Sequence, residues 1–412
     1  MSLQEAVKPY DRITLLLQGG GALGAYQAGI YEGIHNNGIR INSISGISIG
    51  ALNTAVIAGN PPEKRIEALR GFWETITRRN YTSDAFNPYK YMLGHIGWWG
   101  QIPGVVDAFP YIFENSFLKQ QLRTLESSTE AFQTMLEGQR GFFKPRYQIP
   151  LYTTPNHLSH YTTDQLYRTL ERFCDLDLVN RPEVMRVSVS AVNVRSGNYA
   201  VFCNENEELR YEHFIASGAL PPGFPAVEID GEFYWDGGMV SNTPLNDILE
   251  HEESLKQLIF QVDLWDARGN LPDNMKAIDE RIKDIQYSSK TRMITDVMGQ
   301  RLRYNRLIKE LLAMIPDKKN QAARRAIAEA EALADVGVKN VIHLIYRKKS
   351  YERGHKDYEF SSTTMHDHWD SGLHDITQTF RHTDWFELPP DDEIFVTHDI
   401  HDKRRQMSQK GR

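Results

Sequence analysis

The chain has 412 residues, which suffices for one large α/β domain with an extension or for two domains. Its composition, 41% hydrophobic and 25% charged, is that of an ordinary globular protein. The net charge of −7 argues against a nucleic-acid partner, because proteins that bind a duplex normally present a basic face.

Short apolar runs alternate with stretches of helical periodicity in the first part of the chain. This alternation predicts an α/β fold with a largely parallel sheet and helices on its faces. We expect strands at residues 12–18, 41–45, 184–192, 199–203, 258–264 and 340–346. We expect helices at residues 22–37, 49–59, 62–78, 162–173, 208–218 and 244–251.

From about residue 271 the sequence pattern changes to one that is mainly helical. Apolar residues at roughly helical spacing over 273–314 predict one long or broken helix. A second helix, rich in Ala and Glu, is expected at 320–335. The strand at 340–346 is a candidate to join the main sheet, and we expect the charged tail after 395 to fray.

A glycine-rich loop follows the first expected strand, in the sequence LLLQGGGALGAYQAGI (15–30). Gly19, Gly21 and Gly24 match the dinucleotide-binding pattern G-x-G-x-x-G between a strand and a helix. That fold also needs an acidic residue about 20 positions further on, to hold the ribose. The corresponding sequence, RINSISGISIGALN, contains no Asp or Glu, which argues against a nucleotide.

The same stretch contains a G-x-S-x-G pattern, Gly46-Ile47-Ser48-Ile49-Gly50, between an expected strand and an expected helix. A serine on such a sharp turn needs glycine on both sides, because the tight backbone leaves no room for Cβ atoms. We therefore interpret Ser48 as a candidate nucleophile, with Gly46 and Gly50 forming its elbow. By itself the pattern also occurs by chance in many proteins.

A serine that attacks an ester needs an oxyanion hole and a base. Gly19, Gly20 and Gly21 can supply the oxyanion hole, because bare backbone lets several N–H groups converge on one oxygen. The base is either one of the 14 histidines or Asp236, in YWDGGMVSNTPL. Neighbouring aromatic residues would desolvate Asp236 and raise its pKa, whereas the alternative is an ordinary Asp-Gly hairpin turn.

Four sequence blocks resemble those of the patatin-like phospholipases and occur in the same order. They are LQGGGALGAYQAG, GISIGALN, ASGALPPGFP (216–225) and DGGMVSNTPL. The resemblance covers residues 12–266 and implies a three-layer α/β/α fold with a mostly parallel central sheet. It also implies a hydrolase that cleaves carboxylic ester bonds of lipids without a cofactor or metal.

The resemblance also implies roles for individual residues. Ser48 matches the nucleophile, Asp236 matches its partner in a Ser-Asp dyad that needs no histidine, and Gly19 to Gly21 match the oxyanion hole. The chain departs from the pattern at Leu23, where members usually carry Arg or Lys. That cation is suited to binding a phosphate, so its absence leaves substrates without a phosphate open. These are a soluble ester, a thioester or a storage polyester. A non-catalytic lipid- or nucleotide-binding module is the alternative of a different class.

Three further features allow two interpretations each. Residues 81–117 are rich in aromatic side chains, which favours either a cap over an acyl pocket or a Trp-rich patch that touches lipid on the one hand, or an insertion with its own core on the other. Basic residues within 301–325 suit an anionic surface or a solvated helix face. In MHDHWDSGLHD, the side chains of His366, His368, Asp370 and His374 could ligate zinc, or they belong to a polar surface or a helix cap. His366, Asp370 and His374 would share a helix face, but Gly372 argues against a continuous helix there, so we assign no metal.

We divide the chain into an acyl hydrolase domain over 12–266, with the aromatic insertion at about 81–150, and a helical C-terminal extension over 271–412. The extension resembles that of one bacterial subgroup of the family, and we expect it to pack on the catalytic domain. Cys174 and Cys203 form no CxxC pattern and are expected to be buried free thiols, with a disulfide as the alternative.

The N-terminus, MSLQEAVKPYDR, has no basic segment followed by an apolar core, and no apolar run approaches the ~20 residues of a membrane span. We therefore expect a cytoplasmic protein, with transient contact with a membrane or lipid surface left open. The sequence does not indicate an oligomeric state.

Overall fold

The computed structural model describes residues 2–77, 127, 131, 134–146, 154–251, 254–288, 291–314, 321–334, 337–349, 352, 356–390, 393 and 395–400. The aromatic-rich stretch at 81–117 lies outside the described residues.

Eleven strands and twelve α-helices are named within these ranges. The strands are β1 (Arg12–Leu17), β2 (Ser43–Gly46), β3 (Lys144–Pro145), β4 (Tyr161–Thr162), β5 (Arg186–Asn193), β6 (Tyr199–Cys203), β7 (Val227–Ile229), β8 (Glu232–Asp236), β9 (Gln257–Asp263), β10 (Lys339–Ile345) and β11 (Phe395–Asp399). The helices are α1 (Leu3–Val7), α2 (Ala25–Asn36), α3 (Ile49–Ala58), α4 (Arg65–Ile76), α9 (Asp164–Phe173), α10 (Leu176–Val179), α11 (Tyr211–Ser217), α12 (Leu245–His251), α13 (Met275–Tyr287), α14 (Thr291–Ala313), α15 (Gln321–Ala334) and α16 (Ser362–Thr379).

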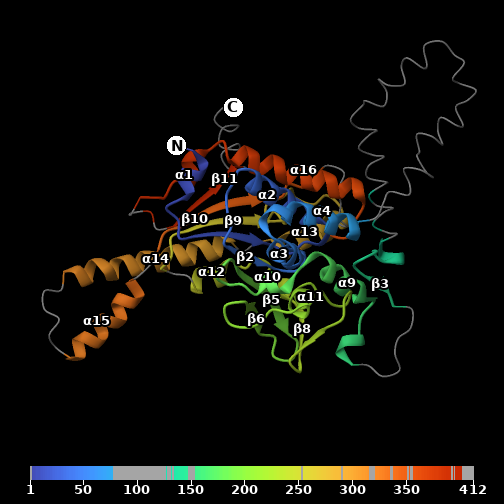
Figure 1. The fold of residues 1–412 in the computed structure, drawn as a ribbon, viewed down its shortest axis with the longest axis horizontal. Coiled ribbons are helices and arrows are strands. Elements are labelled where there is room, and N and C mark those ends of the chain that lie inside the picture. The colour runs from blue at the N-terminus through green and yellow to red at the C-terminus, as the bar shows by residue number, and fades with distance from the viewer. Residues whose placement is uncertain are drawn as a thin grey trace, which may run out of the picture.

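One sheet organises the protein, with helices packed on both of its faces (Figure 1). Its strand order is β11-β10-β9-β1-β2-β5-β8-β7, and β6 also pairs with β5. The pairs from β11 to β5 are parallel, whereas β6, β7 and β8 pair antiparallel. The predicted α/β fold with a mostly parallel sheet is confirmed.

Strand β1 shows why the sheet is covered on both faces. Leu15 and Leu17 belong to the main hydrophobic core, whereas Leu16 belongs to a second cluster with Leu245 and Leu249 of α12. Alternate side chains of a strand point to opposite faces, so an uninterrupted run of leucines needs helices on both sides.

Helices α2 and α16 pack closely along one face of the sheet (Figure 1). A Cβ atom on Gly29 would lie 2.0 Å from the carbonyl oxygen of Trp369, and one on Gly372 would lie 2.0 Å from that of Tyr26. Gly372 therefore lets two helix backbones approach each other. The expectation that Gly372 argues against a continuous helix is wrong, because α16 runs unbroken through it.

The suspected metal ligands of α16 do not form a site. No group of three or more His, Cys, Asp or Glu side chains with metal-binding geometry occurs among the described residues. His368 is buried instead and bonds to Glu352 at 2.6 Å, which gives this histidine a structural partner.

The C-terminal region contributes to the main sheet as well as to its covering. Strand β10 joins β9 to β11, so the strand expected at 340–346 is part of the sheet. The expectation that the tail frays from 395 is wrong for β11 (Phe395–Asp399), which pairs with β10. The division of the chain at about 266–271 stays a prediction.

Candidate active site

The turn at Ser48 follows β2 at the edge of the sheet where β1 also ends. Leu17 of β1 pairs with Gly46 of β2, so the loops after the two strands emerge side by side. Ser48 has φ 56° and ψ −124°, a conformation that costs free energy for a residue with a side chain. It directly precedes α3, whose N-terminal end favours negative charge nearby.

The glycines that flank Ser48 are required by the turn. A Cβ atom on Gly46 would lie 2.3 Å from the carbonyl oxygen of Gly50, and one on Gly50 would lie 2.2 Å from that of Leu17. Any side chain at either position would force the backbone apart. The geometry is therefore that of a strand-turn-helix elbow, as the G-x-S-x-G pattern predicts.

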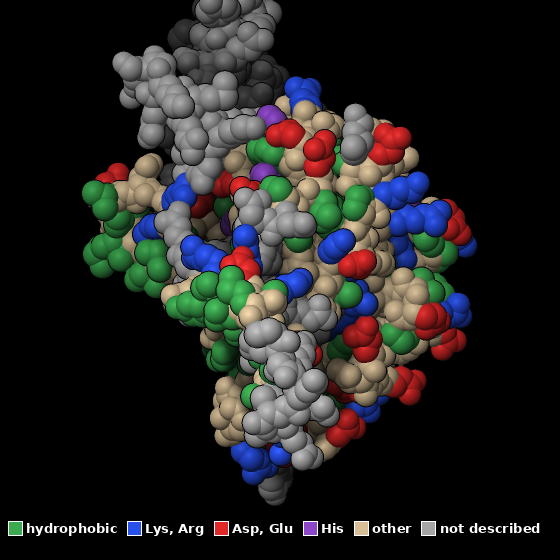
Figure 2. Space-filling view, turned by 90° about the vertical axis from the view of Figure 1, so that its left-hand side faces the viewer, with side chains coloured by type: hydrophobic (Ala, Val, Ile, Leu, Met, Phe, Trp, Pro, Cys, Tyr) green, Lys and Arg blue, Asp and Glu red, His purple; other side chains and the backbone are tan. Residues whose placement is uncertain are grey.

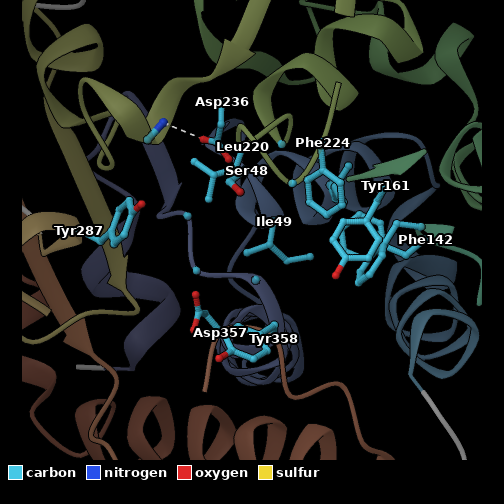
Figure 3. A pocket seen from close by; sticks show the side chains of 18 of the residues that line it. Ser48, Ile49, Phe142, Tyr161, Leu220, Phe224, Asp236, Tyr287, Asp357 and Tyr358 are labelled. Atoms are coloured by element: carbon cyan, nitrogen blue, oxygen red, sulfur yellow. Dashed lines mark hydrogen bonds between the residues drawn. The ribbon is translucent and has the colours of Figure 1, made fainter. Parts of the chain in front are cut away.

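Asp236 is the last residue of β8 and lies beside Ser48 in the same cavity (Figure 3). Its side chain is 3% exposed, and its Oδ1 accepts a hydrogen bond from the Gly238 N–H at 2.7 Å. Burial raises the pKa of Asp236 to about 7, even though hydrogen bonds from Gly238 and from the Ser48 hydroxyl lower it. A carboxylate with this pKa can accept a proton near neutral pH.

The glycine loop lies next to Ser48. A Cβ atom on Gly19 would lie 2.9 Å from the Cβ of Ser48, and Gly21 has φ +55°. Within the described part of the chain, no acceptor binds the backbone N–H groups of Gly19, Gly20 and Gly21. These donors are therefore available to an oxygen in the cavity.

Side chains from later parts of the chain hold the glycine loop in place. The carbonyl oxygen of Gly19 accepts hydrogen bonds from Asn242 Nδ2 at 3.0 Å and from Trp265 Nε1 at 2.8 Å. The N–H of Ala22 donates to the carbonyl oxygen of Asp357 at 2.8 Å. Asn242 lies in the DGGMVSNTPL block, but nothing in the sequence connects Trp265 or Asp357 with this loop.

A cavity of about 370 Å³ adjoins Ser48, Asp236 and the three glycines (Figure 3). Most of its wall is apolar, including Leu52, Met135, Phe142, Phe143, Tyr161, Leu220, Phe224 and Phe360. No histidine is among the described residues that line it. Asp236 is thus the lining residue best placed to act as a base toward Ser48.

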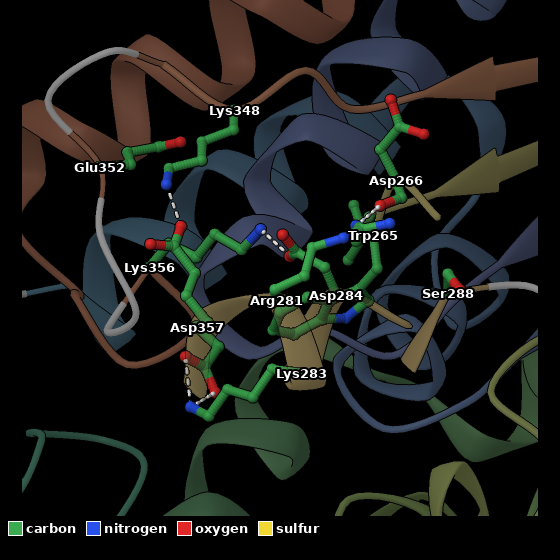
Figure 4. A network of polar contacts seen from close by, with 12 residues as sticks. Trp265, Asp266, Arg281, Lys283, Asp284, Ser288, Lys348, Glu352, Lys356 and Asp357 are labelled. Atoms are coloured by element: carbon green, nitrogen blue, oxygen red, sulfur yellow. Dashed lines mark hydrogen bonds and ion pairs between the residues drawn. The ribbon is translucent and has the colours of Figure 1, made fainter. Parts of the chain in front are cut away.

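Leu23, which stands where a basic residue was expected, is fully buried in the main hydrophobic core. Two lysines of the C-terminal region lie near the glycine loop, and both are in ion pairs (Figure 4). Lys356 bonds to Asp284 at 2.6 Å and lies over the Trp265 ring, and Lys283 bonds to Asp357 at 3.1 Å. The loop itself therefore contributes no side-chain charge to the cavity.

The comparison with known families decides which kind of protein this is. A model described as patatin-like phospholipase matches residues 15–249, more than half of the chain. The chain belongs to the patatin-like phospholipase family. A second model, described as patatin phospholipase, matches residues 285–392 of this patatin-like chain, a stretch that includes β10 and α16. The recognition of the family from the four motifs is confirmed, and with it the general class of lipid ester hydrolases.

Two solved structures resemble this patatin-like protein weakly. VipD from Legionella pneumophila has a TM-score of 0.36 and 14% identity, with 90% of this chain and 67% of that chain covered. Human GIVD cytosolic phospholipase A2 has a TM-score of 0.30 and 12% identity, with 63% of this chain and 45% of that chain covered. No curated protein sequence matches the chain.

Other predictions concern the surroundings of the site. Cys174 and Cys203 are free and buried, as expected, and burial raises the pKa of Cys174 to about 12. Within the described ranges, every helix is too short or too polar to cross a bilayer.

The burial of Asp236 predicts a pH-dependent stability. Its pKa is about 7 in the folded protein against 3.8 for an ordinary aspartate, so the folded state keeps a proton that the unfolded chain has already lost. Wild type therefore loses stability as the pH rises between these values. From pH 5 to pH 8, we expect the free energy of unfolding of Asp236→Asn to rise by about 2 to 3 kcal/mol relative to that of wild type, measured by urea unfolding.

The control for this experiment is Asp230→Asn, because Asp230 is a surface residue whose side chain is 73% exposed. Its unfolding free energy should follow that of wild type at both pH values. An Asp236→Asn protein with the same pH dependence as wild type would show that Asp236 is not protonated in the folded state near neutral pH.

Proposed function

We propose that the protein is a serine acyl hydrolase that cleaves carboxylic esters of lipids through a Ser48-Asp236 dyad. The observation that carries the proposal is a buried carboxylate with a pKa of about 7 beside a serine on a strained turn. Family membership supports the same general chemistry.

In the first half of the reaction, Asp236 accepts the proton of the Ser48 hydroxyl as Ser48 Oγ attacks the ester carbonyl carbon. The carbonyl oxygen becomes negative and is stabilised by the N–H groups of Gly19, Gly20 and Gly21. The tetrahedral intermediate then collapses, the bond to the alcohol breaks, and Asp236 returns its proton to the departing alkoxide. An acyl-Ser48 ester remains.

In the second half, water attacks the acyl-Ser48 carbonyl carbon while Asp236 takes one of its protons. The same N–H groups stabilise the second oxyanion, and the proton on Asp236 returns to Ser48 Oγ as the fatty acid leaves. One carboxylate thus shuttles the proton in both steps, and no histidine is required.

The aromatic and aliphatic wall of the cavity supports a substrate with an apolar acyl chain. Leu23 stands where members of the family usually carry a basic residue, so the proposed substrate does not have to contain a phosphate group. A non-catalytic binding module has no use for a strained serine and a buried aspartate together, because both cost folding free energy. The storage-polyester, thioester and soluble-ester alternatives share the same chemistry and differ in substrate.

A fluorophosphonate probe tests the nucleophile directly. We expect one label per wild-type molecule at Ser48, because the probe traps a serine whose proton is removed by a nearby base. Ser48→Ala should remain unlabelled, and Asp236→Asn should label at least about a thousandfold more slowly. Absence of label on folded wild type, judged by circular dichroism, would favour the binding module.

The pH profile tests the base. With a soluble p-nitrophenyl ester, kcat/KM should rise tenfold per pH unit below about 7 and level off above it, because only the ionised Asp236 accepts a proton. Asp230→Asn should keep this profile, whereas Asp236→Asn should have little activity at any pH. Normal hydrolysis by Asp236→Asn would refute its assignment as the base.

A substrate panel tests the acyl preference. We expect kcat/KM to increase with acyl length across p-nitrophenyl esters, because each methylene buried in the cavity adds roughly 0.8 kcal/mol. Phospholipids, lysophospholipids and hydroxyalkanoate oligomers assayed beside them identify the natural class. A preference for acetate over longer chains would contradict a lipid substrate.

A further inference from the structure

Helix α13 directs three charged side chains, Arg281, Lys283 and Asp284, toward the rest of the protein. Lys283 pairs with Asp357, and Asp284 pairs with Lys356, whose side chain is 4% exposed (Figure 4). Arg281 donates to backbone carbonyl oxygens in the segment after β9. The polar side of α13 is therefore its attached side.

The apolar side of α13 faces outward. Met275, Ile282 and Ile285 are 75%, 54% and 57% exposed, and Leu271, just before the helix, is 94% exposed. Ile278 lies on the same side, so the spacing of three, four and three residues makes one stripe. A surface helix normally buries its apolar stripe and solvates its charges. Helix α13 does the opposite.

Helix α14 also exposes apolar side chains, and it adds positive charge. Its outward apolar residues are Val297, Tyr304, Leu307 and Leu311, followed by Met314. Its sequence contains five basic and two acidic residues, in a chain whose overall charge is −7. Figure 1 shows α14 and α15 projecting from the body, and Figure 2 shows hydrophobic side chains gathered beside Lys and Arg on the face seen from that side.

This concentration is unusual for the molecule. Of the 16 large hydrophobic residues that are exposed in the described part of the chain, ten lie between Leu271 and Met314. We call these ten residues the docking face. Five of them lie on or just before α13 and five on or just after α14, and exposed apolar residues gathered in this way mark an interaction site rather than ordinary surface.

The docking face leads to the cavity. Tyr287, the last residue of α13, lines the same cavity as Asp236 (Figure 3). Its carbonyl oxygen accepts hydrogen bonds from Asn242 at 2.8 Å and from Gln18 at 3.2 Å, next to the glycine loop. One helix therefore connects the exposed apolar stripe with the reacting groups.

We propose that the docking face binds a lipid surface with anionic headgroups, so that its apolar side chains enter the headgroup region and substrate passes along α13 to the cavity. Apolar residues flanked by Lys and Arg, as on α14, are the pattern of helices that lie in a membrane interface. A symmetric dimer through the same face would bring two positively charged α14 helices together, which disfavours a second copy as the occupant. Substrate delivery rests on the proposed hydrolase, whereas surface binding does not.

The test measures binding with catalysis removed. Ser48→Ala protein is sedimented with vesicles of phosphatidylcholine and phosphatidylglycerol in equal parts, and with vesicles of phosphatidylcholine alone. We expect binding to the mixed vesicles that weakens with salt. Adding Met275→Asp and Ile282→Asp should reduce the partition coefficient at least about tenfold, because both side chains then resist leaving water.

The matched control is Val184→Asp, since Val184 is 57% exposed but precedes β5 at the opposite end of the sheet. Val184→Asp should bind to the mixed vesicles as strongly as the Ser48→Ala protein into which it is introduced. In a background with Ser48 intact, all variants should hydrolyse a soluble short ester equally, which verifies folding and separates docking from chemistry. If the aspartate pair misfolds, Met275→Gln with Ile282→Gln replaces it.

Binding that is absent, or unchanged by both substitution pairs, overturns the docking proposal while soluble-ester hydrolysis still supports the dyad. Dimerisation in analytical ultracentrifugation that the Met275 and Ile282 substitutions abolish also overturns it, because the face would then bind a second copy. Vesicle binding without any hydrolysis leaves docking intact and refutes the proposed function instead.

Discussion

The parallel pairing of β1 with β2 is the contact on which the candidate site depends. Because Leu17 pairs with Gly46, the glycine loop and the Ser48 turn leave the sheet at the same level. The pairing brings the two loops so close that a Cβ atom on Gly19 would lie 2.9 Å from that of Ser48. Parallel strands end at a common edge, so two motifs about 30 residues apart meet, and the Ile47 N–H donates to the carbonyl oxygen of Leu17 at 3.0 Å between them.

Residues from the second half of the chain complete the site. Asn242 and Trp265 bind the Gly19 carbonyl oxygen, and Asp357 binds the N–H of Ala22, which orients the peptide groups between them. Tyr287 adds a wall of the cavity and a carbonyl acceptor for Asn242. The region after 271 therefore lines the cavity and holds the glycine loop as well as covering the sheet.

Burial has opposite uses in the two functional parts of the molecule. Around Asp236 it removes water from a carboxylate and moves its pKa toward neutrality, which suits a base. On α13, Lys283 and Asp284 are partly buried in ion pairs, and the apolar residues are left outside. Both arrangements cost folding free energy in water, and the proposed hydrolysis of a lipid ester in a dry cavity would account for both.

The sequence by itself determined the local features, because they depend on residues adjacent in the chain. Four motifs identified the family, and G-x-S-x-G with its flanking strand and helix predicted the elbow at Ser48, since only glycine fits beside that turn. Strands β1, β2, β5, β6, β9 and β10 followed from apolar runs, with small errors at their ends, whereas β3, β4, β7, β8 and β11 were not among the expected strands. These patterns need no knowledge of distant contacts.

Only the tertiary structure decided what depends on residues far apart in the chain. Gly372 was misread because its role is to admit the α2 backbone, 343 positions away at Gly29, and no local pattern reports that contact. The same holds for Trp265 and Asp357 at the glycine loop, and for the outward apolar stripe of α13. A helical pattern shows that one face is apolar, but which face meets the protein is set by the partners that fold against it.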